Sequence, residues 1–206
     1  MSVWEPLTDT VGVYRTESYP VHEDALRLAE FAHIRPSDRV LDLGTGNGIL
    51  AVYALALHGG TYTGIDLDED ALSLAKQSAE RNGQAITFLQ STVESASDRL
   101  GHGSFDRILM NPPYYTSGNV GRNALARHAD GTLLEKWCRA AFQLLNNGGT
   151  LTLCYPAEQL AVLFRVLDRN RLSPKRIALL FSDETARLAL VEAKKLGGDG
   201  VKITKA

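Results

Sequence analysis

Short apolar segments alternate with amphipathic segments along most of the chain. Arg39–Leu43 and Thr61–Asp66 have the pattern of buried strands. Each is followed by apolar residues at helical spacing, over about residues 48–57 and again behind Asp68, which fits a helix N-cap. Further strands are predicted at residues 86–89, 105–110 and 150–155, and helices near 93–100, 133–145 and 158–170. Because strands separated by helices require right-handed crossovers, the pattern predicts an α/β fold with a mainly parallel sheet.

Both ends of the chain depart from this alternation. Residues 23–32 have the pattern of an amphipathic helix, and residues 1–21 before it are irregular. After residue 170 the helical pattern stops, and residues 175–181 and 187–193 predict an antiparallel strand pair that closes the sheet edge. We therefore expect a seven-stranded, mostly parallel sheet with an antiparallel edge hairpin and a short N-terminal helical flap. The flap would take residues 1–34 and the main domain residues 35–206.

The composition is that of one globular domain. The 206 residues are 44% apolar and 22% charged, which excludes a disordered or collagen-like chain. No apolar run approaches the roughly 18 residues that span a bilayer, and the N-terminus carries Glu5 and Asp9 where an export signal would be basic and then apolar. The two cysteines, Cys138 and Cys154, are too few for a zinc site or a disulfide framework. We expect a cytoplasmic protein with no membrane partner and no bound metal.

Charge is distributed unevenly between the two halves of the chain. Residues 1–110 hold 16 acids and 8 bases, and residues 111–206 hold 8 acids and 14 bases, so that the halves carry −8 and +6. The asymmetry fits an acidic partner that meets the C-terminal part, and it equally fits basic side chains on solvated helices. If the partner is a nucleic acid, the phosphate contacts are expected in the densest basic run, made of Arg165, Arg169, Arg171, Lys175 and Arg176 together with Lys194 and Lys195.

A glycine-rich segment, Asp42-Leu-Gly-Thr-Gly-Asn-Gly48, follows the first predicted strand. In a doubly wound sheet ligands bind beyond the carboxyl ends of the strands, and alternating glycines let a ligand lie against bare backbone. The spacing differs from the dinucleotide fingerprint, because a third glycine would be due at position 49, where Ile49 stands. Asp66 ends the second strand, where a carboxylate can accept hydrogen bonds from both ribose hydroxyls of an adenosine. These features predict a nucleoside site.

The glycine loop, its own acid Asp42 and Asp66 together resemble the S-adenosylmethionine site of class I methyltransferases. The resemblance implies a Rossmann-like fold and S-adenosylmethionine as the cofactor. Many relatives also carry an acid after the third strand to hold the adenine amine, whereas this chain offers Gln90, Ser91 and Thr92 there. The predicted cofactor contacts are Asp42, Gly44, Gly46, Gly48, Asp66 and Thr92.

The fourth predicted strand runs directly into Asn111-Pro-Pro-Tyr114. The two prolines remove backbone donors and stiffen the turn, so the Asn111 side chain and nearby carbonyl groups can be held as acceptors. Such acceptors suit an exocyclic amine, because accepting its N–H hydrogens localises the nitrogen lone pair toward a methyl donor. Tyr114 can stack on a planar base, a contact worth about 1 to 3 kcal/mol. The alternative is an ordinary proline turn with a surface tyrosine.

This tetrad resembles the motif of the amino-methyltransferases that modify adenine N6, cytosine N4 or glutamine N5. Flanking segments such as Gly12-Val-Tyr-Arg15, Ala126-Arg-His128 and Asn147-Gly-Gly149 are similar to the bacterial tRNA adenine-N6 methyltransferase family. The resemblance implies tRNA or another structured RNA as substrate. It implies catalytic roles for Asn111, Pro112 and Tyr114, and substrate contacts by Pro113, Tyr115 and Arg127, the last as a phosphate contact or an ordinary surface arginine.

Two other functions stay open. A glutamine N5-methyltransferase of release factors shares the tetrad and would take a protein as substrate. Such an enzyme usually carries an extra N-terminal helical domain, for which about thirty residues ahead of the first strand leave little room. The other alternative is a cofactor-binding partner protein without catalysis, for which the missing acid near Thr92 is the argument.

Overall fold

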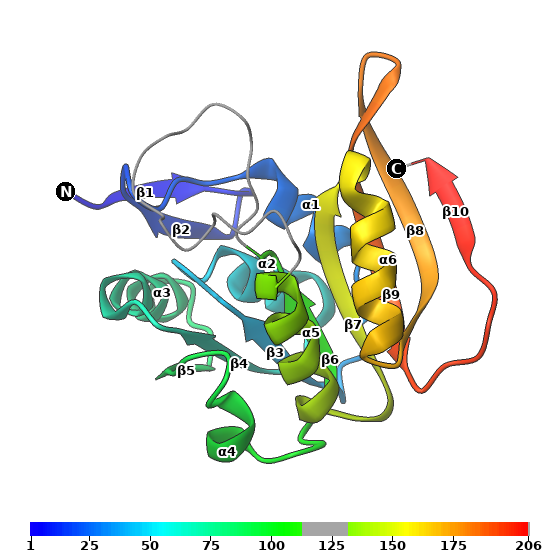
Figure 1. Ribbon diagram of the computed structural model, residues 1–206. Coiled ribbons are helices and arrows are strands. Elements are labelled where there is room, and N and C mark those ends of the chain that lie inside the picture. The colour runs from blue at the N-terminus through cyan, green and yellow to red at the C-terminus, as the bar shows by residue number, and fades with distance from the viewer. Residues whose placement is uncertain (113–131, 206) are drawn as a thin grey trace.

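A central sheet of eight strands lies between two layers of helices (Figure 1). The computed structural model describes residues 1–112 and 132–205. The strands are β1 (Val3–Pro6), β2 (Gly12–Arg15), β3 (Arg39–Leu43), β4 (Thr61–Asp66), β5 (Ile86–Gln90), β6 (Phe105–Met110), β7 (Leu145–Pro156), β8 (Leu172–Ser182), β9 (Thr185–Lys195) and β10 (Lys202–Lys205). The helices are α1 (Glu23–Phe31), α2 (Ile49–His58), α3 (Glu69–Arg81), α4 (Ala96–Leu100), α5 (Thr132–Leu144) and α6 (Leu160–Arg169), the last preceded by a 3₁₀ turn, η2 (Ala157–Gln159).

The strand order is β10-β8-β9-β7-β6-β3-β4-β5. The pairs from β7 through β6, β3 and β4 to β5 are all parallel, and β9 pairs antiparallel with both β7 and β8. Helices α1, α2 and α3 pack on one face of the sheet, while α4, α5 and α6 pack on the other (Figure 1). This arrangement confirms the predicted α/β, Rossmann-like fold with a mostly parallel sheet and an antiparallel hairpin.

The predicted count of seven strands was wrong, because β10 adds an eighth strand beyond the hairpin. It pairs in parallel with β8, from Lys202 opposite Arg176 to Lys205 opposite Leu179. The β8–β9 hairpin therefore does not close the sheet edge. The ammonium group of Lys175 contacts the carbonyl oxygens of Gly198, Asp199 and Gly200, which fixes the turn that leads into β10.

The N-terminal segment, predicted to be irregular, contains a small antiparallel hairpin of β1 and β2. The rings of Trp4 and Tyr14 meet edge to face across it at 5.2 Å between centroids. Arg81 of α3 places its guanidinium 4.1 Å from the centroid of the Trp4 ring. Asn82 donates to and accepts from the backbone of Gly12. Contacts with residues about 70 positions away therefore stabilise the hairpin, which is why its local sequence did not predict it.

Alternation along β3 directs neighbouring side chains into the two helical layers. Leu41 and Leu43 enter the core shared with α5 and α6, whereas Val40 enters the core shared with α1 and α2. Asp42 points to the α2 side, where it accepts from the backbone N–H of Ala51. Because β3, β4 and β6 are parallel neighbours, the segments that follow them meet at one edge of the sheet. Among the described helices, none is both long and apolar enough to cross a bilayer.

Candidate active site

The glycine loop between β3 and α2 adopts backbone conformations that favour glycine. Gly44 and Gly46 have φ values of +78° and +54°. A Cβ at Gly44 would lie 2.4 Å from the Trp137 ring of α5, whereas one at Gly46 would meet nothing within 4 Å. A Cβ at Gly48 would lie 2.8 Å from that of Ala75 in α3. Gly46 thus presents bare backbone to open space, and Gly48 permits close packing between α2 and α3.

Asp42 is a buried carboxylate beneath this loop, with 1% of its surface exposed. Its Oδ2 accepts from the hydroxyl of Thr45 at 2.7 Å and from the Ala51 N–H at 3.2 Å. Burial raises the pKa of Asp42 to about 7, although these two hydrogen bonds act in the opposite direction. A cation placed beside Asp42 would favour its ionised form.

Asp66 links the end of β4 to the glycine loop. One oxygen of its carboxylate accepts from the Gly46 N–H at 2.8 Å, and the other accepts from the Asp68 N–H at 3.0 Å. Each oxygen keeps a further lone pair, so the carboxylate can still accept hydrogen bonds from a ligand's hydroxyl groups. Asp68 caps α3 as predicted, because its side chain accepts from the N–H groups of Asp70 and Ala71.

The N-terminal segment lies against the same loop, an arrangement that the sequence did not predict. The Asn47 amide donates to the carbonyl oxygens of Tyr14 at 3.2 Å and Tyr19 at 3.4 Å. The Tyr19 hydroxyl donates to Asp68, and this bond lowers the pKa of that carboxyl. The flap is therefore fastened to both the glycine loop and the start of α3.

These elements enclose a cavity of about 170 Å³. It is lined by Asn111, by residues of the glycine loop and the start of α2, and by residues of the flap and α1. The loop and α2 contribute Asp42, Gly44, Thr45, Gly46, Asn47, Ile49 and Leu50, and the flap and α1 contribute Ser18, Tyr19, Pro20, His22 and Ala25. The structure thus brings together Asp42, Gly44, Gly46 and Asn111 from the predicted set, with Asp66 bonded to the loop. Gly48 and Thr92 do not line this cavity.

Asn111 follows β6 and is half-buried, and the next residue, Pro112, is buried. The Asn111 Oδ1 atom accepts a hydrogen bond from the thiol of Cys154 on the neighbouring strand β7, at 2.8 Å. An amide oxygen has two lone pairs, so one remains for another donor. Pro113, Tyr114, Tyr115 and Arg127, the other predicted catalytic and substrate residues, lie outside the described residues.

The end of β5 has Gln90, Ser91 and Thr92 where the resemblance to class I methyltransferases implies an acid. Thr92 is exposed, and its hydroxyl oxygen accepts from the Ser95 N–H at 3.1 Å. Beside it Gln90 donates to the carbonyl oxygen of Leu67 at 3.1 Å. The Leu67 side chain, directly after Asp66, is 59% exposed. An apolar surface is therefore available next to the carboxylate that we expect to bind a ribose. Its signal in the sequence was a leucine directly after Asp66.

The predicted basic run does not act as one group. The Lys195 ammonium is buried, donates to the Leu145 carbonyl at 2.6 Å and lies 4.4 Å from the centroid of the Phe142 ring. Arg176 donates to the Phe31 carbonyl at 2.6 Å and stacks over the same residue's ring. With Lys175 engaged by the turn before β10 and Arg171 lying 6.0 Å from the centroid of the Phe142 ring, four of the seven cations in the run have structural contacts. Their sequence positions gave no sign of these contacts.

A glycine loop after β3, an acid at the end of β4 and Asn111-Pro112 after β6 stand at the carboxyl edge of a sheet that ends in an antiparallel hairpin. Fold and site together define a class I methyltransferase. More specifically, the chain belongs to the methyltransferase small domain family, whose profile matches residues 24–161.

Individual relatives give a consistent picture of the fold and a varied one of the substrates. The tRNA1(Val) (adenine(37)-N6)-methyltransferase of Shewanella halifaxensis is 28% identical over 158 residues, which cover 74% of this chain and 64% of that protein. The ribosomal protein L11 methyltransferase of Thermus thermophilus is 44% identical over 93 residues, 44% of this chain and 35% of that protein. The solved structure of a T. thermophilus 16S rRNA N2 methyltransferase (RsmC) in complex with AdoMet and guanosine has a TM-score of 0.67 and 18% identity. That comparison covers 95% of this chain and 50% of the other.

Proposed function

We propose that this protein transfers the methyl group of S-adenosylmethionine to an exocyclic amine, with adenine N6 in tRNA as the acceptor. The observation that carries the proposal is the cavity that Asn111 lines together with Asp42, Gly44 and Gly46. A cofactor seated on the loop would then present its methyl group to an amine held by Asn111.

The residues around the glycine loop fit S-adenosylmethionine. Asp42 is a buried carboxylate, and within residues 1–112 and 132–205 no cation contributes to its pKa, so the cofactor's ammonium group would supply one. Asp66 has lone pairs left for two ribose hydroxyls, and exposed Leu67 offers an apolar surface to adenine. When bound, the cofactor supplies an electrophilic methyl on a sulfonium. The chain's own part is to fix the position of that methyl by the loop.

Asn111 would act on the acceptor nitrogen. Its Oδ1 atom accepts one N–H hydrogen of the amine, and a carbonyl oxygen near Pro112 accepts the other, which concentrates the lone pair on the nitrogen. Methylation of such a nitrogen needs no strong base, because the proton can leave after the methyl has transferred. Catalysis is then chiefly positioning, with the nitrogen and the methyl carbon held about 3 to 3.5 Å apart and in line with the sulfur.

The choice of adenine in tRNA is supported by relatives that match 74% of the chain and by the Asn-Pro-Pro-Tyr tetrad. The chain spans 64% of the length of the first of these relatives. A protein amine or amide is the second candidate, supported by the 44% identity to a ribosomal protein L11 methyltransferase over 93 residues. That stretch is shorter, so we favour the nucleic acid.

The proposal is tested by offering possible acceptors to the purified protein in parallel. Labelled S-adenosylmethionine would be incubated with unmodified tRNA, 16S rRNA, duplex DNA, ribosomal protein L11 and a release factor. Nucleoside and peptide mass spectrometry would then identify the product. We expect label in tRNA as N6-methyladenosine. Label in a protein, with none in nucleic acid, would establish the second candidate, and a protein that binds the cofactor but labels no acceptor would support a non-catalytic role.

A further inference from the structure

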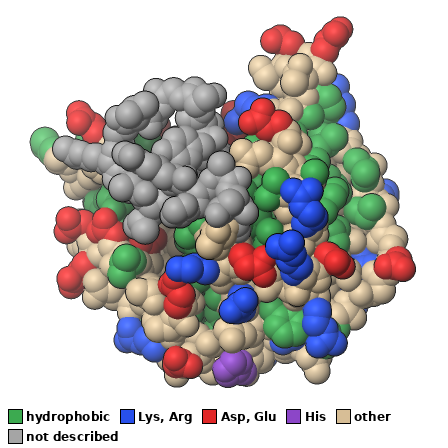
Figure 2. All heavy atoms as spheres, viewed as in Figure 1, with side chains coloured by type: hydrophobic (Ala, Val, Ile, Leu, Met, Phe, Trp, Pro, Cys, Tyr) green, Lys and Arg blue, Asp and Glu red, His purple; other side chains and the backbone are tan. Residues whose placement is uncertain are grey.

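The two helical layers carry opposite charge. Helices α1 and α3 together hold more acids than bases, whereas α5 and α6 hold more bases than acids. Acidic side chains gather over α3 in Figure 2, and basic ones lie over α5 and α6. In α1 and α3 the acids are Glu23, Asp24, Glu30, Glu69, Asp70 and Glu80, and the bases are Arg27, Lys76 and Arg81. In α5 and α6 the bases are Lys136, Arg139, Arg165 and Arg169, and the acids are Glu135 and Asp168.

The basic side chains of α5 and α6 also make fewer contacts than those of α1 and α3. Arg139, Arg165 and Arg169 are exposed, and within residues 1–112 and 132–205 none of the three makes a hydrogen bond, an ion pair or a ring contact. Lys136 pairs with Glu94 at 3.0 Å, but both side chains stay more than half exposed. Exposed pairs of this kind contribute little energy, so Lys136 can be drawn to a stronger anion. We call Lys136, Arg139, Arg165 and Arg169 the α5–α6 surface.

In the acidic layer, by contrast, two of the three cations already have partners. Arg27 bonds to Glu23 and Glu30 of its own helix. Arg81 stacks on Trp4 and donates to the Tyr14 hydroxyl at 3.0 Å. An anion approaching this layer would meet unneutralised carboxylates and few free cations.

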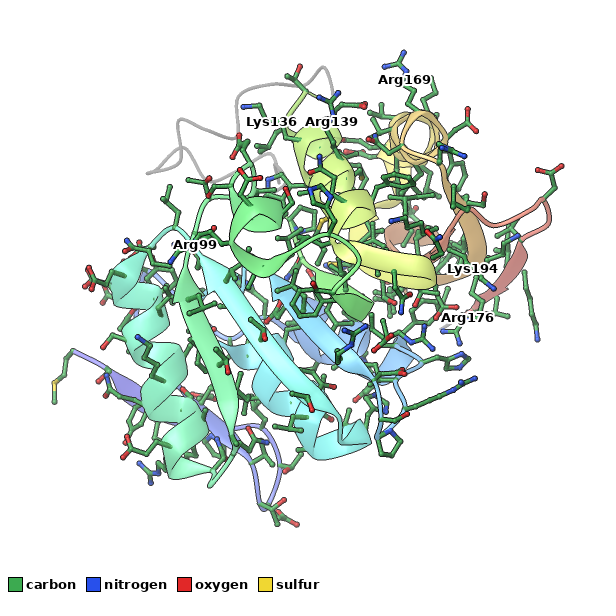
Figure 3. All side chains as sticks on the ribbon, turned by 90° about the horizontal axis from the view of Figure 1, so that it is seen from below. Arg99, Lys136, Arg139, Arg169, Arg176 and Lys194 are labelled. Carbon is green, nitrogen blue, oxygen red and sulfur yellow. The ribbon has the colours of Figure 1, made fainter. Side chains whose placement is uncertain are left out.

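Helix α5 connects the α5–α6 surface with the candidate site. The Asn170 amide donates to Glu135 at 2.9 Å and joins the end of α6 to the first turn of α5. Arg169 precedes Asn170, and Arg139 lies one turn after Glu135, so the link brings the cations of the two helices to one surface. Figure 3 shows Lys136, Arg139 and Arg169 directed outward along the same side of the molecule. Trp137 of the same helix reaches the glycine loop at Gly44, so α5 extends from this surface to the site.

We propose that the α5–α6 surface binds the phosphate backbone of the RNA whose base enters the cavity. This inference rests on the proposed function and names the part of the chain that holds its substrate. Cations that neutralise phosphates release condensed counterions, which is the main source of sequence-independent affinity for nucleic acids. The acidic layer of α1 and α3 repels the same backbone, so the charges of both layers direct the RNA across α5 and α6.

The test compares two double variants that lose the same net charge. Arg165→Ala/Arg169→Ala removes two cations of the α5–α6 surface. The matched control, Lys76→Ala/Lys202→Ala, removes two exposed cations from α3 and β10, neither of them in the predicted basic run. Affinity for unmodified tRNA would be measured at several salt concentrations, with calorimetric binding of S-adenosylmethionine as a check on the fold and on the cofactor site.

We expect the arginine variant to bind tRNA about tenfold or more weakly at low salt. The salt slope, which is the slope of the logarithm of the binding constant against the logarithm of the salt concentration, should fall in magnitude by about two, since each phosphate contact contributes nearly one. The control should retain the wild-type slope, and both should bind the cofactor normally. The proposal is overturned if the arginine variant keeps the wild-type salt slope, or if the control loses as much affinity for tRNA and as much of the slope as the arginine variant does. Because product identity is determined separately with the wild-type protein, N6-methyladenosine together with an unaffected arginine variant would refute this surface and leave the proposed function intact.

Discussion

The thiol of Cys154 donates a hydrogen bond to the Oδ1 atom of Asn111, 2.8 Å away on the neighbouring strand. Met110 and Leu153 are register partners of β6 and β7, so the residues that follow them lie side by side at the carboxyl edge of the sheet. The thiol occupies one of the two acceptor positions of the amide oxygen and thereby fixes the direction of the other. We infer that Cys154 is a positioning residue for Asn111.

Replacing Cys154 with alanine should slow methyl transfer without weakening the binding of the cofactor. A neutral hydrogen bond contributes about 0.5 to 1.5 kcal/mol, which corresponds to a rate loss of roughly 2- to 12-fold. Single-turnover rates with saturating tRNA would measure the loss, and calorimetry would show an unchanged Kd for S-adenosylmethionine.

Cys154→Ser is the matched control, because the hydroxyl keeps a donor at the same position. Its rate should return toward that of the wild type, whereas Cys154→Val, similar in size but without a donor, should behave like the alanine variant. Equal rates in the serine and valine variants would mean that residue 154 acts through packing alone.

Asp66→Ala should weaken binding of S-adenosylmethionine. The change removes a carboxylate that we expect to accept two ribose hydrogen bonds, and it also removes the acceptor of the Gly46 N–H. Charge-assisted bonds of this kind contribute about 1.5 to 3 kcal/mol, so the Kd should rise roughly 10- to 150-fold. Titration calorimetry measures this directly, and an unchanged Kd would remove Asp66 from the cofactor site.

Asp42 should make the cofactor-free protein less stable as the pH rises. Burial raises its pKa from the ordinary 3.8 to about 7, so the folded state binds a proton that the unfolded state has released. The contribution of Asp42 to the free energy of unfolding is fully present below about pH 4 and is lost as the pH rises through about 7. Three pKa units correspond to roughly 4 kcal/mol. Urea unfolding at pH 5, 6, 7 and 8 without cofactor would measure the trend.

The control for this pH dependence is Asp42→Asn, which cannot ionise. The difference in unfolding free energy between the variant and the wild type should shift in favour of the variant by roughly 2 to 3 kcal/mol between pH 5 and pH 8, since about two units of the pKa shift fall in that range. The same variant should bind S-adenosylmethionine more weakly, because the ammonium group loses its carboxylate. Parallel pH profiles for the two proteins would show that Asp42 does not titrate in this range.

The sequence predicted the parts of the fold and site that depend on local pattern. Strands β3 to β9 and the helices between them follow from apolar periodicity, and the glycine loop follows from spacing that a simple turn does not need. Such features require little knowledge of distant contacts. Asp68 capped its helix as expected for the same reason.

The features that the sequence did not predict depend on long-range contacts. The β1–β2 hairpin is held by Arg81 and Asn82, and β10 is a four-residue strand stabilised by pairing with β8. The flap residues that line the cavity are placed there by Asn47, whose role no local pattern indicates. The availability of a cation also depends on packing, since Lys195 is buried against Phe142 while neighbouring Lys194 is exposed.

Asn111→Ala tests whether Asn111 acts on the acceptor amine beside a cofactor held by the glycine loop. The measurement is the single-turnover rate of N6-methyladenosine formation in tRNA, paired with the Kd for S-adenosylmethionine. Losing one oriented polar group at the reacting centre costs about a hundredfold in rate. We predict a rate at least about 100 times lower with a Kd near that of the wild type. A variant that methylates tRNA at the wild-type rate would show that Asn111 does not act on the acceptor amine.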